Sequence, residues 1–449
     1  MLRYIAIVTS GLVLFFLVAR HVAVVRFLST INNDIIFENI YINGYAVGGM
    51  MPAEAKNALR EAAGLDRQII GFVHNDSLIY KFTFKDFGAE YDFSQLVSEA
   101  FLYGRTGSRR ERYDKLRALE HRSHEILGQP IYRYNEALIP ERLELVRKQA
   151  SLLPVNAYMR LESAGFVITE GVPGHTPDMQ EAAEQVKKIL ISRQPGQVEL
   201  NMHTILPTYN AQHFSQAKSL LGSFYTPYTG GEEMPRNINI RLAAAHINNT
   251  VVYPGDVFST REALGPITPE QGYTAASVIV DGQMVEDFGG GVCQVASTLY
   301  NAVLFAELPV IERANHSIKV QYLDFGFDAA IAGDYMDLKF KNNLSYPVLV
   351  TARASGGILE IQIYGRETRP PNRTLAFVSE LIEVIPPEPE RILIDDNLPS
   401  GHVLVSTEPR DGYRYELFRI IFIDGEQVEK EKINTSVYRP VQGVITKGP

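Results

Sequence analysis

The chain has a single cysteine, Cys293, among its 449 residues. With one thiol no intramolecular disulfide can form, and neither an iron–sulfur cluster nor a zinc site with several cysteine ligands can be built. We therefore expect a protein without a cofactor. The length exceeds what one compact core usually holds, so several domains are expected.

The chain also lacks an excess of positive charge. It carries 43 Lys and Arg against 52 Asp and Glu, which gives a net charge of -9 and a pI near 5.7. Binding to a nucleic-acid backbone requires a positively charged footprint, which this composition does not supply. We expect no nucleic-acid partner.

A long apolar run lies at the amino terminus, over residues 4–19, and continues beyond Arg20. The first stretch is shorter than the ~20 residues that span a hydrocarbon core, but Arg20 can extend its aliphatic stem and place its charge at the interface. A signal peptide would require small residues at a cleavage site, and His21 and Ala23 fit that requirement poorly. We predict an uncleaved, single-pass membrane anchor over residues 1–28.

The region that follows, residues 35–210, mixes strand and helix patterns. Ile40 and Ile42 alternate as in a strand, and Pro52 is placed to open a helix in its first turn. A similar layout returns at residues 164–190, where Asp178 or Thr176 can cap a helix. This region is predicted to be α+β.

Residues 222–368 show a second α+β pattern, with helices expected at 237–247 and 293–308 among several strands. The paired prolines 370 and 371 mark a boundary, because proline cannot join a central strand. The tail, residues 375–449, contains short alternating strands separated by turn residues. We predict a small all-β domain there.

The cysteine lies in the stretch FGGGVCQVASTLYNA, residues 288–302. Three glycines permit positive φ and deliver the chain sharply into the helix expected from Cys293. At a helix start the free amide N–H groups and the helix dipole stabilise a thiolate, so the pKa of Cys293 should fall below ~8.5. Gln294 adds an amide donor that could hold an oxyanion.

A cysteine nucleophile also requires a base and an orienting carboxylate. The stretch ERANHSIKVQYL, residues 312–323, reads as a strand that places His316 on its inward face. Strand parity in YMDLKF favours Asp334 on the buried side and puts Asp337 on the polar side, while Asp328 lies in the preceding loop. We predict further binding residues around the same site: Gly289, Gly290, Gly291, Ser297 and Tyr300.

Two other interpretations stay open at this point. Cysteine is among the most buried residue types, so Cys293 can be a small packed residue, with His316 a satisfied core histidine and the aspartates turn or capping groups. A metal bound by Cys293, His316 and an aspartate is the third interpretation, but no paired ligand spacing supports it. We expect no metal site.

At these residues the sequence resembles the VanW family, named for an accessory protein of vancomycin-resistance clusters. The resemblance covers residues 235–345, with order and spacing intact. It is carried by the strings RNINIRLAAAHINNTVVYPGDVFS, EQGYTAASVIVDG, FGGGVCQVASTLYNAVL, ERANHSIKVQY and FGFDAAIAGDYMDLKFKN. The family's motif matches Cys293, Gln294, His316, Asp328 and Asp337, so we place Asp337 first as the third member of the triad.

The flanking regions resemble two cell-wall modules. The upstream region, with INGYAVGGMMPAEAKNAL, FKDFGAEYDFSQLVSEAFLYGRTGS and FVITEGVPGHTPD, is similar to YoaR-like domains proposed to bind peptidoglycan. The tail, with YRYELFR and INTSVYRPVQGVITKG, resembles a small five-glycine β domain linked to N-acetylglucosamine binding. The glycines concerned are Gly401, Gly412, Gly425, Gly443 and Gly448.

These resemblances imply an extracytoplasmic bacterial protein whose partners are peptidoglycan or another cell-wall glycan, and the membrane. The predicted function is a membrane-anchored cell-envelope protein that binds or maintains peptidoglycan. The alternative is a Cys-His-Asp enzyme, of amidase, peptidase or transpeptidase type, that acts on cell-wall peptide or another acyl substrate.

Overall fold

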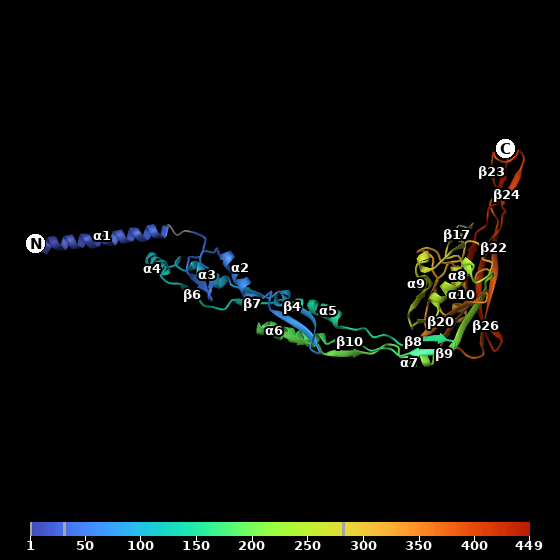
Figure 1. Cartoon of the computed structure of the whole chain (residues 1–449), viewed down its shortest axis with the longest axis horizontal. Coiled ribbons are helices and arrows are strands. Elements are labelled where there is room, and N and C mark those ends of the chain that lie inside the picture. Colours follow the sequence, from blue (N-terminus) through green and yellow to red (C-terminus); the bar gives the residue numbers. More distant parts are fainter. Residues whose placement is uncertain (1, 30–32, 281–282) are drawn as a thin grey trace. The chain divides into compact units, whose positions relative to one another are not determined.

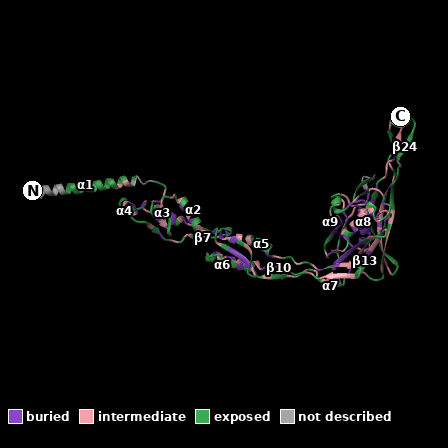
Figure 2. Ribbon diagram, in the orientation of Figure 1, coloured by how far each residue is buried: buried purple, intermediate pink, exposed green. Residues whose placement is uncertain are grey.

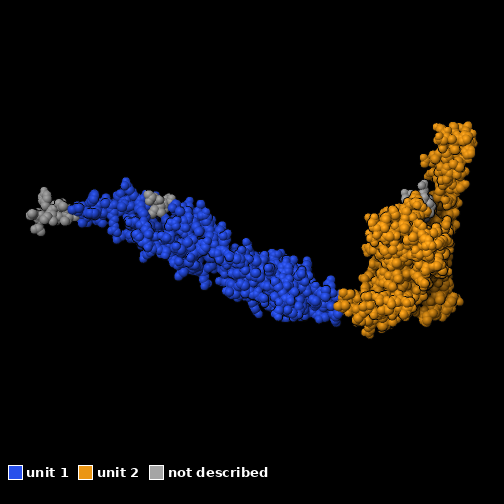
Figure 3. Space-filling model, in the orientation of Figure 1, with its two compact units in different colours: residues 1–154, 173–206 blue, residues 155–172, 207–449 orange. Residues whose placement is uncertain are grey.

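The computed structural model describes residues 2–29, 33–280 and 283–449, and these residues form two compact units (Figure 1, Figure 3). The first unit contains residues 1–154 and 173–206, and the second contains 155–172 and 207–449. Helices and strands are mixed, with one apolar amino-terminal helix and a small all-β carboxyl-terminal region. This confirms the predicted multidomain α+β class.

The amino-terminal helix α1 (Leu2–Ser29) is apolar all round rather than amphipathic. Its stretch Ser10–Phe27 has a mean hydropathy of 1.7 and is long and apolar enough to cross a membrane. No residue of that stretch is buried by the described chain, although Phe27 packs beside Tyr113, and the stretch is mostly green in Figure 2. Length and composition alone do not separate a membrane anchor from a signal sequence, because both are apolar helices near an amino terminus.

Two cores lie in the first unit. The first packs the helices α2, α3 and α4 with a three-stranded sheet of order β2-β1-β6. The elements are β1 (Ile40–Ile42), β2 (Tyr45–Ala46), α2 (Pro52–Ala63), α3 (Ser94–Leu102), α4 (Arg109–Leu119) and β6 (His124–Ile126). Pro52 opens α2 as predicted, and Gly64 ends it at φ 65.

The second core packs α5 and α6 with the sheet β11-β3-β4. The elements are β3 (Ile69–His74), β4 (Ser77–Thr83), η1 (Phe84–Phe87), β5 (Glu90–Asp92), β7 (Ile131–Arg133), α5 (Leu138–Ala150), β10 (Gly174–Pro177), α6 (Met179–Ser192), β11 (Gly196–Glu199) and β12 (Met202–Ile205). Asp178 caps α6 by accepting hydrogen bonds from the N–H groups of Gln180 and Glu181. The predicted capping is therefore confirmed.

The second unit is built on a four-stranded antiparallel sheet of order β13-β21-β20-β14. Helices α8 and α10 pack on it, and α10 contacts both β13 and β21. The elements are β13 (Ser219–Pro227), α8 (Pro235–Ile247), β14 (Thr250–Val252), α10 (Val292–Phe305), β20 (Val348–Ser355) and β21 (Ile358–Gly365). Every residue of α10 from Gln294 to Leu304 is buried, so this helix is the centre of the core.

Shorter elements surround this core. The hairpin β16-β17 precedes α10, and the sheet β15-β19-β18 lies beside it. Their bounds are β8 (Tyr158–Glu162), β9 (Gly165–Thr169), α7 (Ala211–Ser215), β15 (Val257–Ser259), α9 (Thr260–Leu264), η2 (Pro269–Gln271), β16 (Ala275–Val280), β17 (Gln283–Phe288), β18 (Val310–Glu312) and β19 (Lys339–Lys341). Residues 155–172 join this unit because Ala157 and Met159 are buried with Phe214 and Leu349.

The carboxyl-terminal region is all-β, as predicted, and forms two three-stranded sheets. They have the orders β22-β25-β26 and β23-β27-β24. Their bounds are β22 (Arg373–Ile385), β23 (Arg391–Ile394), β24 (Val403–Thr407), β25 (Gly412–Ile423), β26 (Glu426–Tyr438) and β27 (Val444–Lys447). Leu417 of β25 is fully buried in the core around α10, so the first of these sheets docks on the second α+β region.

Two predicted strands differ from the structure. Residues 313–323 are irregular, because β18 ends at Glu312, so strand parity cannot place His316. In YMDLKF the strand begins only at Lys339, and the residues before it do not alternate. Asp337 is therefore buried and Asp334 exposed, the reverse of what parity predicts.

Candidate active site

The three glycines before Cys293 bring the start of α10 close to two neighbouring segments. Gly291 is the N-cap of α10 with φ 107, and Gly289 has φ 84, a region that favours glycine. A Cβ on Gly290 would lie 2.7 Å from the carbonyl oxygen of Ser277 in β16. A Cβ on Gly291 would lie 2.9 Å from the carbonyl oxygen of Arg236 in α8. Glycine is required here for both conformation and space.

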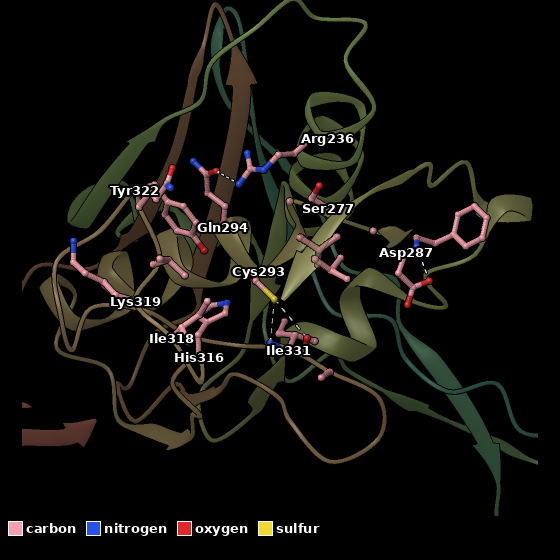
Figure 4. Close-up of a pocket in the computed structure, with 18 of the residues that line it drawn as sticks. Arg236, Ser277, Asp287, Cys293, Gln294, His316, Ile318, Lys319, Tyr322 and Ile331 are labelled. Carbon is pink, nitrogen blue, oxygen red and sulfur yellow. Dashed lines mark hydrogen bonds between the residues drawn. The ribbon is translucent and has the colours of Figure 1, made fainter. Parts of the chain in front are cut away.

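This turn places Cys293 in the first turn of α10, half-buried on the wall of an open cleft (Figure 4). The backbone N–H of Ile331 donates to its sulfur at 3.5 Å, and the thiol can donate to the Ile331 carbonyl at 3.5 Å. The cleft has a volume of about 2210 Å³ and is lined by α8, the start of α10, residues 316–322 and the carboxyl-terminal domain. The sulfur therefore has both a local donor and access to solvent.

His316 lies beside the sulfur, and its other side is held by Asp328. Its ring Nδ1 is 2.7 Å from Oδ2 of Asp328, and its backbone N–H donates to the same oxygen at 2.7 Å. Because the backbone and the ring of His316 both bind the same oxygen of Asp328, the orientation of the ring is fixed relative to the backbone. The structure thus brings Cys293, His316 and Asp328 together in series.

Asp328 is fully buried, and two further residues bind its Oδ1. Arg313 forms an ion pair with it at 3.2 Å, and the hydroxyl of Tyr438 donates to it at 2.6 Å. Tyr438 is the last residue of β26, so the carboxyl-terminal domain contributes directly to the surroundings of the triad. A buried carboxylate with this many charge-assisted partners stays ionised.

The charges of the triad are strongly coupled. Burial raises the pKa of the Cys293 thiol, but the hydrogen bond and the charge of His316 together lower it by more. The pKa therefore falls below its usual value. Burial lowers the pKa of His316, while Asp328 and Cys293 outweigh it and raise the pKa to about 9. The pKa of Asp328 is raised by burial but lowered more by His316 and Arg313. A thiolate–imidazolium pair is therefore favoured at neutral pH.

The structure corrects the prediction that Asp337 is the third member of the triad. Its carboxylate accepts from the Ser259 hydroxyl at 2.6 Å and from the Arg261 N–H at 3.0 Å, so it caps the start of α9 instead of holding His316. Asp334 is exposed and pairs with Arg261 at 3.2 Å. Of the three predicted aspartates, only Asp328 contacts His316, because the chain between β18 and β19 folds its loop back onto the histidine.

Three other predicted site residues are held by neighbouring groups, and of these Gln294 lines the cleft (Figure 4), whereas Ser297 and Tyr300 lie behind it. The side-chain amide of Gln294 donates to Thr226 Oγ1 and to the Pro227 carbonyl, each at 2.9 Å, so it has no donor left for an oxyanion. Ser297 exchanges hydrogen bonds with the backbone of residue 329, and the Tyr300 hydroxyl accepts from Asn434. Gln294, Ser297 and Tyr300 are thus positioning and packing groups. Gly289 and Gly291 line the cleft, whereas Gly290 contacts the hairpin.

Residues near the triad that the sequence analysis missed come from distant segments. Arg236 in the first turn of α8 donates to Oε1 of Gln294 at 2.8 Å, and its guanidinium lies 6.0 Å from the ring centroid of Tyr322. Both line the cleft. Arg313 and Tyr438 were missed as well. A signal was present for all three, since Arg236 belongs to the string RNINIRLAAAHI, Arg313 to ERANHSIKVQY and Tyr438 to INTSVYRPVQGVITKG.

The described residues contain no cluster of three or more His, Cys, Asp or Glu side chains arranged to hold a metal ion. What the triad does offer is a nucleophilic sulfur, a proton donor and a buried anion that holds the donor in place. The backbone N–H of Cys293 finds no acceptor within the described chain, which leaves it available to a bound group. This arrangement can attack a carbonyl carbon and donate a proton to a leaving group.

Comparisons with known proteins match three separate regions of the chain. A family described as "VanW like protein" matches residues 235–364, and the "Putative peptidoglycan binding domain" family matches residues 80–199. A family described as "G5 domain" matches residues 379–449. Each of the three resemblances predicted from the sequence is confirmed by these matches.

Two named proteins are similar to the chain. "Uncharacterized protein YoaR" of Bacillus subtilis (strain 168) is 30% identical over 239 residues, which cover 53% of this chain and 75% of that protein. "Vancomycin B-type resistance protein VanW" of Enterococcus faecalis (strain ATCC 700802 / V583) is 28% identical over 124 residues, or 25% of this chain and 44% of that protein. A solved structure described as "IgA1 Protease G5 domain structure" is 29% identical, covers 17% of this chain and 92% of that one, and has a TM-score of 0.14.

Proposed function

The chain belongs to the VanW family, and from this premise we propose that it is a membrane-anchored, extracytoplasmic protein that binds peptidoglycan and attacks an acyl bond there with Cys293. The observation that carries the chemical part is the contact series Cys293, His316 and Asp328 in an open cleft.

The binding part rests on the modular composition. The peptidoglycan-binding and G5 matches, with the two relatives, support a cell-wall-associated protein. Two wall-binding regions on one chain would strengthen attachment, because the second binding event becomes intramolecular. A helix whose stretch Ser10–Phe27 is long and apolar enough to cross a membrane supports the tether.

The chemical part follows from the protonation states. The Cys293 thiolate adds to an amide carbonyl, and the backbone N–H of Cys293 is placed to bind the oxygen that becomes negative. His316, protonated and held by Asp328, donates its proton to the departing nitrogen, so the C–N bond breaks and a thioester forms. Neutral His316 then takes a proton from water or from an acceptor amine, which attacks the thioester and releases the thiolate.

Alkylation of Cys293 tests the chemical part. We expect iodoacetamide at pH 6.5 to label native Cys293 at least about tenfold faster than the same protein carrying His316→Gln, because the imidazolium that lowers the thiol pKa is removed. His246→Gln is the matched control, since His246 lies in α8 and binds the Leu264 carbonyl at 2.8 Å instead of the cysteine. Equal rates in all three proteins would contradict the nucleophile.

Sedimentation with purified sacculi tests the binding part. The full chain in mild detergent should co-sediment with sacculi, and soluble wall fragments should release it. The variant Cys293→Ala should bind equally well, since wall binding is assigned to other regions of the chain. Failure of the wild-type chain to sediment would contradict wall binding while leaving the cysteine chemistry unaffected.

Mass spectrometry of the membrane fraction tests the tether. An uncleaved anchor predicts that peptides from α1 are recovered from the mature protein together with peptides from the second unit. A mature protein that begins after Phe27 and is released into the medium would show that α1 is a signal sequence.

A further inference from the structure

A second charged group shares the cleft with the triad. Arg236 is half-buried at the start of α8, and both Arg236 and Cys293 line the cleft (Figure 4). One of its nitrogens, Nη2, donates to the Gln294 side chain at 2.8 Å. Gln294 is itself held by Thr226 and Pro227, so the guanidinium is anchored to the base of α10 rather than free to swing.

Arg236 has no carboxylate partner among the described residues. Arg261 is paired with Asp334, and Arg313 with Asp328. Three arginines of the carboxyl-terminal domain that line the cleft, Arg391, Arg410 and Arg439, form no ion pair in the described chain either, but they do not adjoin the start of α10. Apart from the single bond to Gln294, its N–H groups have no acceptor in the described chain. Burial lowers the pKa of the Arg236 guanidinium, and the influences that oppose this effect come from Tyr322 and Cys293 rather than from a carboxylate.

A half-buried, permanently charged group without a carboxylate partner is costly for a folded protein, and the Cys293 thiolate offsets only part of that cost. The cost is explained if a bound ligand supplies the negative charge. The planar donors of arginine match the two oxygens of a carboxylate. The cleft carries charges of both signs. Its acidic residues are Glu262, Asp287, Asp334 and Glu408, and its basic residues are Arg236, Arg261, Lys319, Arg391, Arg410 and Arg439.

We propose that Arg236 binds a carboxylate of the substrate, so that Cys293 acts on an acyl compound with a free carboxylate close to the bond attacked, such as the carboxyl end of a peptide. This inference rests on the proposed function, because it names the substrate class of the same site. Arg236 is then a specificity-determining residue and contacts substrate instead of taking part in proton transfer.

Two alkylating reagents that differ only in charge test this directly. Iodoacetate and iodoacetamide transfer similar groups to sulfur, but only iodoacetate has a carboxylate. We expect the iodoacetate-to-iodoacetamide rate ratio at Cys293 to be at least about tenfold higher than for N-acetylcysteine at pH 6.5, as one charge-assisted contact allows. Arg236→Met should lower that ratio by about tenfold, and the ratio itself corrects for any change in the intrinsic reactivity of Cys293. The attraction of iodoacetate to His316 is present in both proteins and cancels in the comparison.

Two matched variants separate position from charge. Lys319→Met removes a positive charge from the same cleft, where Lys319 is exposed and lies over the Phe325 ring, and should leave the ratio unchanged. Arg236→Lys keeps the charge and should retain part of the preference. A ratio that falls as much in Lys319→Met as in Arg236→Met would overturn the assignment, because it would report general charge.

Protection of the wild-type protein avoids any effect of substitution on folding. N-acetylglycylglycine should slow iodoacetamide labelling of Cys293, and its carboxamide should protect at least about tenfold less well. Stronger protection by inorganic phosphate than by the peptide acid would overturn the carboxylate assignment. Ordinary iodoacetamide labelling with no preference for iodoacetate contradicts this inference alone. Slow labelling by both reagents contradicts the proposed nucleophile and, with it, the inference.

Discussion

Replacement of Asp328 by asparagine is the sharpest test of the triad. The carboxylate accepts hydrogen bonds from the ring and backbone of His316, from Arg313 and from Tyr438. Asparagine keeps the size but removes the charge, and its amide group cannot accept from all of these donors. The imidazolium therefore loses the anion that stabilises it.

The magnitude follows from the pKa of His316, which rises from 6.5 to about 9 in the folded protein. That rise corresponds to roughly 3 kcal/mol in favour of the charged ring, which Asp328 and the Cys293 thiolate share. Without Asp328, burial opposes the charged ring and only Cys293 supports it, so the pKa of His316 falls and the thiolate–imidazolium pair is weakened. We expect iodoacetamide labelling of Cys293 at pH 6.5 to fall by at least about tenfold.

The effect on stability has a defined pH window. The folded pKa of Asp328 is lowered, so its contribution is present above an unfolded pKa of ~3.9 and is lost as pH falls. The folded pKa of His316 is raised, so its contribution is complete below ~6.5 and is lost as pH rises through about 9. The difference in unfolding free energy between wild type and Asp328→Asn should be largest between pH ~3.9 and pH ~6.5. It should decrease as the pH rises and be small above about pH 9.

The assay is the labelling rate of Cys293 from pH 5 to pH 10, with urea unfolding of the same samples. Asp337→Asn is the control, because Asp337 is an equally buried aspartate whose partners, Ser259 and Arg261, lie away from the histidine. The control should lose stability and keep the wild-type labelling profile. An unchanged profile in folded Asp328→Asn, or the same shift in both variants, would refute the reasoning.

Three further outcomes are expected. Tyr438→Phe removes one hydrogen bond to Asp328 and should cost about 1.5–3 kcal/mol in urea unfolding, with a smaller upward shift of the labelling profile than Asp328→Asn; an unshifted profile would show that the carboxyl-terminal domain does not position the triad. The Glu307 side chain is 15% exposed and forms ion pairs with three arginines, Arg369, Arg373 and Arg419. Glu307→Gln removes this shared carboxylate and should lower stability by about 2–4 kcal/mol without changing the labelling of Cys293 at pH 6.5. Unchanged stability in urea would contradict this prediction. Gly255→Ala places a side chain at φ 89 with no atom within 4 Å of it, and should cost about 1–2 kcal/mol of stability. Gly291→Ala adds a contact at 2.9 Å with the Arg236 carbonyl oxygen to the same kind of backbone strain, so it should cost more. Equal melting temperatures of the two variants would contradict the close approach of α10 to α8.

The sequence alone determined the modules and the local features of the site. The glycine turn and the helix that begins beside Cys293 are visible because they depend on neighbouring residues, through φ preferences and helix starts. His316 was chosen from a strand pattern that the structure does not form. The three family resemblances follow from the same kind of local pattern, and the comparisons confirm them.

Only the tertiary structure decided which aspartate holds the histidine and what surrounds it. Parity failed because residues 313–323 and the approach to β19 are irregular, so no two-residue period relates them to the buried face. Asp328 meets His316 through a loop, and Arg236 and Tyr438 reach the site from α8 and β26. Such contacts depend on how separate elements pack, and no residue's own neighbours in the chain specify that.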